Sequence, residues 1–228
     1  MEQIISIKPL LAVLASLLVI PILISSTDRP NIREGWTILA GIIKFSIVVS
    51  MLPAVLQGQE LVYTLFSFVP GVSIKFRVDS LGMLFALVAS FLWILTSIYS
   101  IGYMRGLKEH SQTRFFSFFA LALSATIGAA FSANLLTLYM FYEILSLSTY
   151  PLVCHHQDEE SRKSGRKYLI YILGASIGLV LPSMIVCYNI AGTLAFSSQG
   201  ILAGQASPTV LAILLFLFVF GFAKAAIM

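Results

Sequence analysis

Charged residues are scarce in this chain of 228 residues. They make up 11% of the sequence, whereas hydrophobic residues make up 58%. Soluble domains are typically about 45–50% apolar and about 25% charged. This deficit of charge excludes a soluble globular domain and predicts an integral membrane protein. The length of such a chain indicates how many transmembrane helices it holds, and not how many globular domains.

The motifs of soluble catalysis are also missing. The sequence has no phosphate-binding loop, no nucleophile elbow and no zinc-binding signature. Its two cysteines, Cys154 and Cys187, lie within or beside apolar stretches and form no C-x-x-C pair, which favours small buried side chains over a disulfide or a metal site. A haem would need facing histidines at matched depth on two helices, and the sequence offers no such pair. We therefore expect no cofactor and no bound metal.

Long apolar runs fill the chain instead. They predict an all-α integral membrane fold, a single membrane domain over residues 1–228 with seven transmembrane helices. The predicted helices are roughly residues 10–24, 36–56, 81–104, 115–133, 134–153, 168–191 and 210–228. The first run alone could be a signal peptide, but the spans that follow favour a retained helix. Asp79-Ser80 is a candidate N-cap for the third helix, and Pro182 predicts a kink in the sixth.

The segments between these runs are polar or irregular. Residues 61–78 alternate loosely and have Pro70-Gly71 at their centre, which predicts a small extracytoplasmic β-hairpin between the second and third helices. Residues 28–34 are expected to form a charged turn. In the segment 155–167, acidic residues stand four positions before basic ones, the favourable order for salt bridges on a solvated helical extension.

The basic residues are unevenly distributed between the two sides of the membrane. The loops after the first, third and fifth spans carry Arg29, Arg33, Arg105, Lys108, Arg114, Arg162, Lys163, Arg166 and Lys167. The opposite side carries only Lys8, Lys75 and Arg77. The positive-inside rule then places the first set of loops in the cytoplasm and the N-terminus outside. Because the positive charge lies in such loops, the net charge of +4 does not indicate nucleic-acid binding.

One acid lies deep in a predicted span. Glu143 is near the middle of residues 134–153, roughly 14 Å from one end at about 1.5 Å per residue, so it must pair, hydrate or hold a proton. Lys224, in the last span, lies within about 7 Å of the same depth. At about 8 Å and an effective dielectric near 20 the two charges would attract by about 2 kcal/mol. Such a pair could switch protons or hold helices together statically, and spacing alone does not choose between these roles.

Three further residues are candidates for accessory roles. Lys44 interrupts the second span, and its long stem is expected to lift the amine toward the headgroups; the alternative is a functional buried cation. His155 and His156 lie at the cytoplasmic end of the fifth span, where we expect an interfacial role, with a proton relay as the alternative.

Three runs resemble a known family. They are FRVDSLGMLFALVASFLWILTSIYSIGYM (76–104), NLLTLYMFYEILSLSTYPLV (134–153) and GFAKAAIM (221–228). They are similar to the antiporter-like membrane subunits of respiratory complex I, membrane-bound hydrogenases and Mrp cation/proton antiporters, most of all to MrpD-like chains. The resemblance implies that Glu143 and Lys224 are the coupled pair of a hydrated proton path, tuned by Arg166 or Lys167. It also implies a β-hairpin at residues 61–78.

The resemblance carries further expectations. Family members have two inverted repeats after three leading helices, so this chain would be truncated within helix 7, half of a split subunit, or a fragment. It implies a multi-pass, transporter-type subunit of a bacterial or archaeal cytoplasmic membrane. The ions expected to move are H⁺ and, as a second candidate, Na⁺, driven by an ion gradient or by redox enzymes on other chains. Its partners would be other membrane subunits, including one with the missing C-terminal half. The alternatives are an assembly subunit without an ion path and a redox enzyme with its own haem or quinone.

Overall fold

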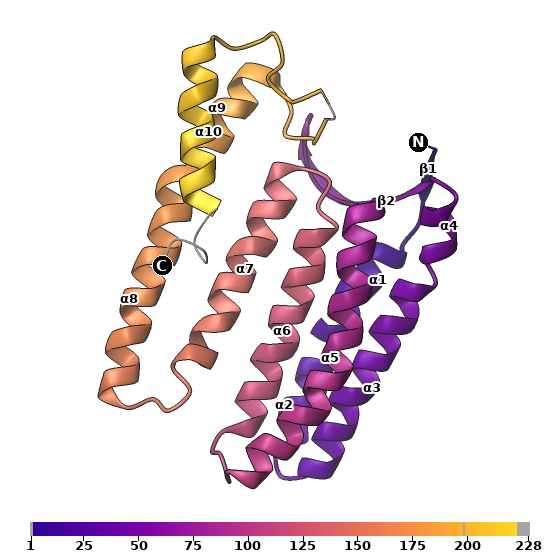
Figure 1. The fold of residues 1–228 in the computed structure, drawn as a ribbon, viewed down its shortest axis with the longest axis vertical. Helices are drawn as coiled ribbons and strands as arrows, with labels where there is room; N and C mark the ends of the chain where they lie inside the picture. The colour runs from indigo at the N-terminus through magenta and orange to yellow at the C-terminus, as the bar shows by residue number, and fades with distance from the viewer. Residues whose placement is uncertain (1, 198, 223–228) are drawn as a thin grey trace.

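The described part of the chain, residues 2–197 and 199–222 of a computed structural model, is mostly helical (Figure 1). The helices stand side by side, and a small sheet lies across one end of them, which we term the sheet end. The turns at residues 107–111 and 154–158 lie at the opposite end, the turn end. The helices are α1 (Lys8–Leu17), α2 (Val19–Ser25), α3 (Pro30–Val49), α4 (Leu52–Leu56), α5 (Ser80–Gly106), α6 (Gln112–Ala130), α7 (Leu135–Val153), α8 (Glu159–Ala175), α9 (Leu181–Ala191) and α10 (Pro208–Phe222), with a π-helical segment, η1 (Ser176–Val180), between α8 and α9.

Five helical segments are long and apolar enough to cross a membrane. They are Lys8–Ser25, Pro30–Leu56, Ser80–Gly106, Gln112–Ala130 and Glu159–Ala191. Their outer faces carry exposed rows of large apolar side chains, as at Leu84, Val88 and Leu92 along α5. Water would disfavour such a surface and a bilayer would not. The chain is therefore a multi-pass membrane protein.

Two further helices stand among these five. The described part of α10 is apolar but shorter, at 15 residues. α7 has 19 residues and contains Glu143, Pro151 and a series of hydroxyl side chains, and it is not among these five segments. Seven spans therefore remain a prediction, and the residues of the last expected span beyond Phe222 lie outside the described part.

The sheet has three strands, β1 (Gln3–Ile5), β2 (Glu60–Val69) and β3 (Val72–Val78), in the order β1-β2-β3. β2 and β3 form the antiparallel hairpin expected from Pro70-Gly71, whereas the short parallel strand β1 was not foreseen. Gly71 turns the chain at φ +79°, and a Cβ there would lie 2.2 Å from the carbonyl oxygen of Gly192. The hairpin tip therefore needs glycine to pack against the end of α9.

Strand β3 also fixes where α7 begins. The side chain of Asn134 accepts a hydrogen bond from the backbone N–H of Thr137 at 2.8 Å, which caps the helix, and its Nδ2 donates to the carbonyl of Ser73 at 2.8 Å. The backbone N–H of Lys75 donates to the hydroxyl of Thr137 at 3.0 Å. The sheet thus sets the depth of every residue along α7, including Glu143.

Of the two charged segments that precede helices, the first differs from its prediction and the second confirms it. Residues 30–34 are not a turn: α3 begins at Pro30, whose fixed φ and missing N–H suit the first turn of a helix. The charged segment before the sixth span is the expected helical extension, since α8 begins at Glu159, and Lys163 pairs with Glu159 at 2.8 Å. Asp158 caps this helix by accepting from the N–H of Ser161 at 2.7 Å.

The sixth span is irregular near Pro182, as predicted, and takes the form of a π-helical segment. Proline cannot donate to the preceding turn, and η1 ends directly before the helix α9 that contains Pro182 in its first turn. α10 packs against this segment so closely that a Cβ on Gly221 would lie 2.4 Å from a methyl group of Val180. The irregular segment is therefore part of the α8–α10 packing.

Candidate functional site

Glu143 lies half-buried on α7, and the two residues before it contact α6 and α10. On the α6 side, a Cβ on Gly128 would lie 2.3 Å from the ring of Phe141, so the two helices meet at a glycine. On the α10 side, the hydroxyl of Tyr142 donates to the carbonyl of Phe222, and their rings meet edge to face at 5.4 Å. Lys224, the predicted partner of Glu143, lies outside the described residues.

Hydroxyl groups follow Glu143 along one face of α7. Ser146 and Thr149 are three and six residues further on, the spacing that keeps side chains on one helix face. The Thr149 hydroxyl lies 2.6 Å from the hydroxyl of Tyr168 on α8. We did not identify this row from the sequence, although its three-residue spacing was visible there. It leads from Glu143 toward the turn end.

Lys44 turns inward, contrary to the expectation that its amine reaches the headgroups. The residue is 0% exposed, and its Nζ donates to the carbonyl of Leu123 on α6 at 3.1 Å. The same amine lies 5.1 Å from the ring centroid of Trp93 on α5. A carbonyl lone pair and the negative face of an indole together solvate the cation within the bundle, so it need not reach water.

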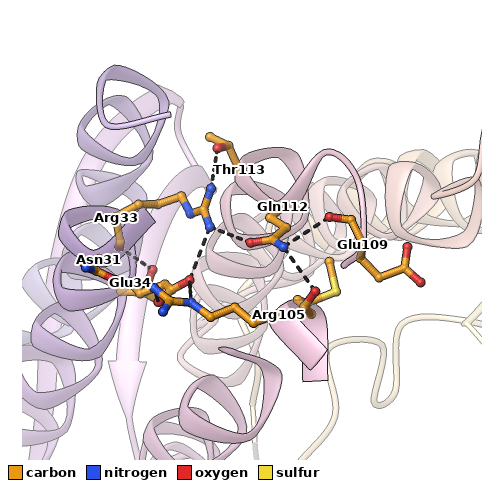
Figure 2. Close-up of polar contacts among 9 residues, drawn as sticks. Asn31, Arg33, Glu34, Arg105, Glu109, Gln112 and Thr113 are labelled. Atoms are coloured by element: carbon orange, nitrogen blue, oxygen red, sulfur yellow. Dashed lines mark hydrogen bonds and ion pairs between the residues drawn. The ribbon is translucent and has the colours of Figure 1, made fainter. Parts of the chain in front are cut away.

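A buried charge network at the turn end was not foreseen from the sequence. Arg33 donates to Thr113 at 3.0 Å and to Gln112 at 2.8 Å, and Glu34 accepts from the Nε of Arg105 at 3.0 Å (Figure 2). The side chains of Arg33 and Glu34 are 5% and 7% exposed. The network joins α3, α5 and α6. Pro30 could have predicted that Arg33 and Glu34 lie within α3, because a proline is common in the first turn of a helix.

The histidines meet a glutamate at the same end. The rings of His110 and His155 lie 4.8 Å apart, and a carboxylate oxygen of Glu109 is 3.7 Å from a ring nitrogen of each. Arg114 donates to the backbone carbonyl of His155 at 2.6 Å. Burial first, then the charges of His110 and Arg114, hold the pKa of His155 below its usual value. His156 is exposed beside them, with its ring 6.0 Å from that of His110.

Arg166 and Lys167 are exposed on α8 and line different hollows. Arg166 shares a pocket of about 380 Å³ with Arg114 and Arg162. Lys167 lines another hollow, together with Glu160. The tuning role that the resemblance implies for Arg166 and Lys167 remains a prediction.

Two family models match the chain. The model described as "NADH:quinone oxidoreductase/Mrp antiporter, TM" matches residues 132–228, a range that contains both Glu143 and Lys224. The model described as "NADH-Ubiquinone oxidoreductase (complex I), chain 5 N-terminus" matches residues 70–116. This chain belongs to the antiporter-like superfamily of membrane subunits.

Curated relatives of this antiporter-like chain include the "Na(+)/H(+) antiporter subunit A1" of Staphylococcus aureus strains bovine RF122 / ET3-1 and Newman. Each is 30% identical over 177 residues, which cover 73% of this chain. The matched part is 22% of the relatives' length, so the chain spans about a fifth of them. These relatives are transporter subunits; the expected likeness to MrpD-like chains remains a prediction.

Two solved structures share the fold of this antiporter-like chain. An archaeal respiratory membrane complex, the membrane-bound sulfane sulfur reductase, matches with a TM-score of 0.76 at 20% identity, over 95% of this chain and 42% of that chain. The Mrp complex from Dietzia sp. DQ12-45-1b matches with a TM-score of 0.75 at 20% identity, over 96% and 41%. Both of these neighbours come from multisubunit membrane complexes.

Proposed function

We propose that this chain is a proton-translocating, antiporter-like subunit of a multisubunit membrane complex, and that Glu143 and Lys224 are its coupled charges. The proposal includes seven spans in one membrane domain, with the N-terminus and hairpin outside a bacterial or archaeal cytoplasmic membrane. The chain would work beside other membrane subunits. It would exchange H⁺ for Na⁺ as its antiporter relatives are named to do, or serve a redox-driven complex whose catalytic sites lie on other chains.

The observation that best supports this proposal is the contact between α7 and α10. Tyr142, the neighbour of Glu143, bonds to the carbonyl of Phe222, which stands two residues before Lys224 in the sequence. The residue before Glu143 therefore contacts the described end of α10, the helix that the sequence continues toward Lys224. An acid and an amine held in such an apolar bundle respond to each other's protonation, because the low dielectric strengthens their interaction.

The polar groups of α7 provide a route for protons to reach this pair. Hydroxyls donate and accept at once, so the row formed by Ser146, Thr149 and Tyr168 can pass protons together with intervening water. The row points toward His155 at the turn end. Lys44 is a buried cation on α3 and is the proposed accessory group.

A structural role is the competing proposal. The buried network of Arg33, Glu34 and Arg105 shows that this fold also uses internal charges as fixed ties between helices. If Glu143 and Lys224 form another such tie, Glu143→Gln combined with Lys224→Met would leave transport intact and reduce the yield of assembled complex.

The deciding experiment is Glu143→Gln in the assembled complex, with cation-driven proton flux measured in membrane vesicles and normalised to the amount of complex. Losing an interaction of about 2 kcal/mol predicts a fall in flux of about 10-fold or more. The matched control is Glu160→Gln, which neutralises an exposed acid on α8 and should leave flux unchanged. Undiminished flux in Glu143→Gln would reject the role of this pair.

A further inference from the structure

The histidines and Glu109 gather where two connections of the fold meet. Glu109 and His110 lie in the turn between α5 and α6, and His155 and His156 lie in the turn between α7 and α8. Both turns lie at the turn end, beyond the apolar spans (Figure 1). One ligand atom each from Glu109, His110 and His156 lie within 4.8 Å of one another.

These distances suit a divalent metal after a small adjustment. Zinc binds imidazole nitrogen and carboxylate oxygen at about 2.0–2.2 Å, so the ligand atoms of a tetrahedral site stand roughly 3.3 Å apart. His110 and His156 are exposed, so their rings can rotate to close the difference. Two imidazoles and a carboxylate suit borderline cations of the zinc class and leave a fourth position for water.

The backbone is strained on both sides of the cluster. Lys108 and Ser111, which flank Glu109 and His110, both have φ of 52°, and Gln157, directly after His156, has φ of 58°. They are the non-glycine residues with positive φ in the described chain, and all three border this cluster. Non-glycine residues adopt this conformation rarely and often at functional sites.

His155 lies behind the three outer residues. Neither of its buried ring nitrogens has a hydrogen-bond partner among residues 2–197 and 199–222, and its Nε2 is 3.7 Å from the Glu109 carboxylate. A buried imidazole without a partner is unfavourable. A ring in this place can orient a carboxylate that binds a metal, the role that residues beside metal ligands commonly have.

We propose that Glu109, His110 and His156 bind a divalent cation of the zinc class, with His155 as the residue that positions the Glu109 carboxylate. The bound ion joins the α5–α6 turn to the α7–α8 turn. It therefore ties the end of α7, the helix that carries Glu143, to the bundle formed by α3, α5 and α6. The site does not depend on whether Glu143 and Lys224 move protons.

Metal binding can be measured on the full chain in detergent, purified through a tag without histidines. Zn²⁺ titration should give one ion per chain. His110→Ala and His156→Ala should each weaken binding by about 10-fold or more, and His155→Ala by about 10-fold. Glu160→Gln, an exposed acid near these turns, should bind Zn²⁺ as the unmodified chain does. Circular dichroism verifies that each variant retains its helices.

Co²⁺ provides a second, independent measurement of the ligands. Bound at this site, it should show the intense visible absorption of a tetrahedral ion, and the double variant His110→Ala/His156→Ala should lose it. The proposal is overturned if the helical double variant binds Zn²⁺ as tightly as the unmodified chain, or if bound Co²⁺ retains the weak spectrum of the hydrated ion.

Discussion

Lys44 illustrates how a single residue can place a charge inside an apolar bundle. Its amine has one carbonyl and one indole face as neighbours, and no carboxylate of the described chain forms an ion pair with it. Desolvating an ammonium group is unfavourable, and these two neighbours compensate for it only in part. A buried cation that reduces stability is more readily explained by a role in function than by packing.

Replacing this cation by an apolar side chain of similar length tests the point. Lys44→Met should raise the midpoint of thermal unfolding in detergent, corresponding to a gain of about 1–3 kcal/mol, because the desolvation penalty is removed. Lys8→Met is the matched control: its Nζ also donates to a backbone carbonyl, that of Ser50 at 3.0 Å, but near the surface. We expect that control to change stability by about 0.5 kcal/mol or less. A lower midpoint for Lys44→Met would show that the buried amine stabilises the fold.

At the scale of elements, the start of α7 depends on the sheet as much as on its own cap. In Asn134→Ala, the lost cap should lower the free energy of unfolding by about 1–2 kcal/mol, and the lost bond to Ser73 should lower it further. Asn134→Ser keeps a capping oxygen and removes the amide donor to Ser73, so it should have an intermediate effect. Asp79→Ala, which removes a cap without a link to the sheet, is the control. Equal losses for Asn134→Ala and Asp79→Ala in chemical unfolding would contradict the proposed anchoring.

The same region shows what could be predicted from the sequence. The hairpin followed from Pro70-Gly71, and the cap of α5 followed from Asp79, because both are set by residues within a few positions of each other. The bond between Asn134 and Ser73 joins positions 61 residues apart, and no local pattern specifies such a pairing. The inward turn of Lys44 was missed for the same reason, since it depends on Trp93 and Leu123 on other helices.

Considered as a whole, the molecule holds its internal acids Glu34 and Glu143 in different surroundings. At the turn end, Arg33, Glu34 and Arg105 are joined by hydrogen bonds and ion pairs across α3, α5 and α6, an arrangement that suits a fixed tie (Figure 2). Near the middle of α7, Glu143 follows Tyr142, which contacts the end of α10, and precedes a row of hydroxyl groups, the arrangement that the proposed proton path would use. The two acids should therefore respond differently to the same substitution.

This difference gives a test that separates structure from transport. Glu34→Gln leaves two guanidinium groups with a neutral partner, of which Arg33 is buried and Arg105 is 45% exposed. Breaking a buried ion pair costs about 3–5 kcal/mol, and the exposure of Arg105 lowers this value. The yield and unfolding midpoint of Glu34→Gln should therefore fall, while proton flux per assembled complex stays near normal. Glu143→Gln should show the reverse: normal yield and reduced flux. If both variants lose yield and retain flux, each acid is a fixed tie, and protons follow another route.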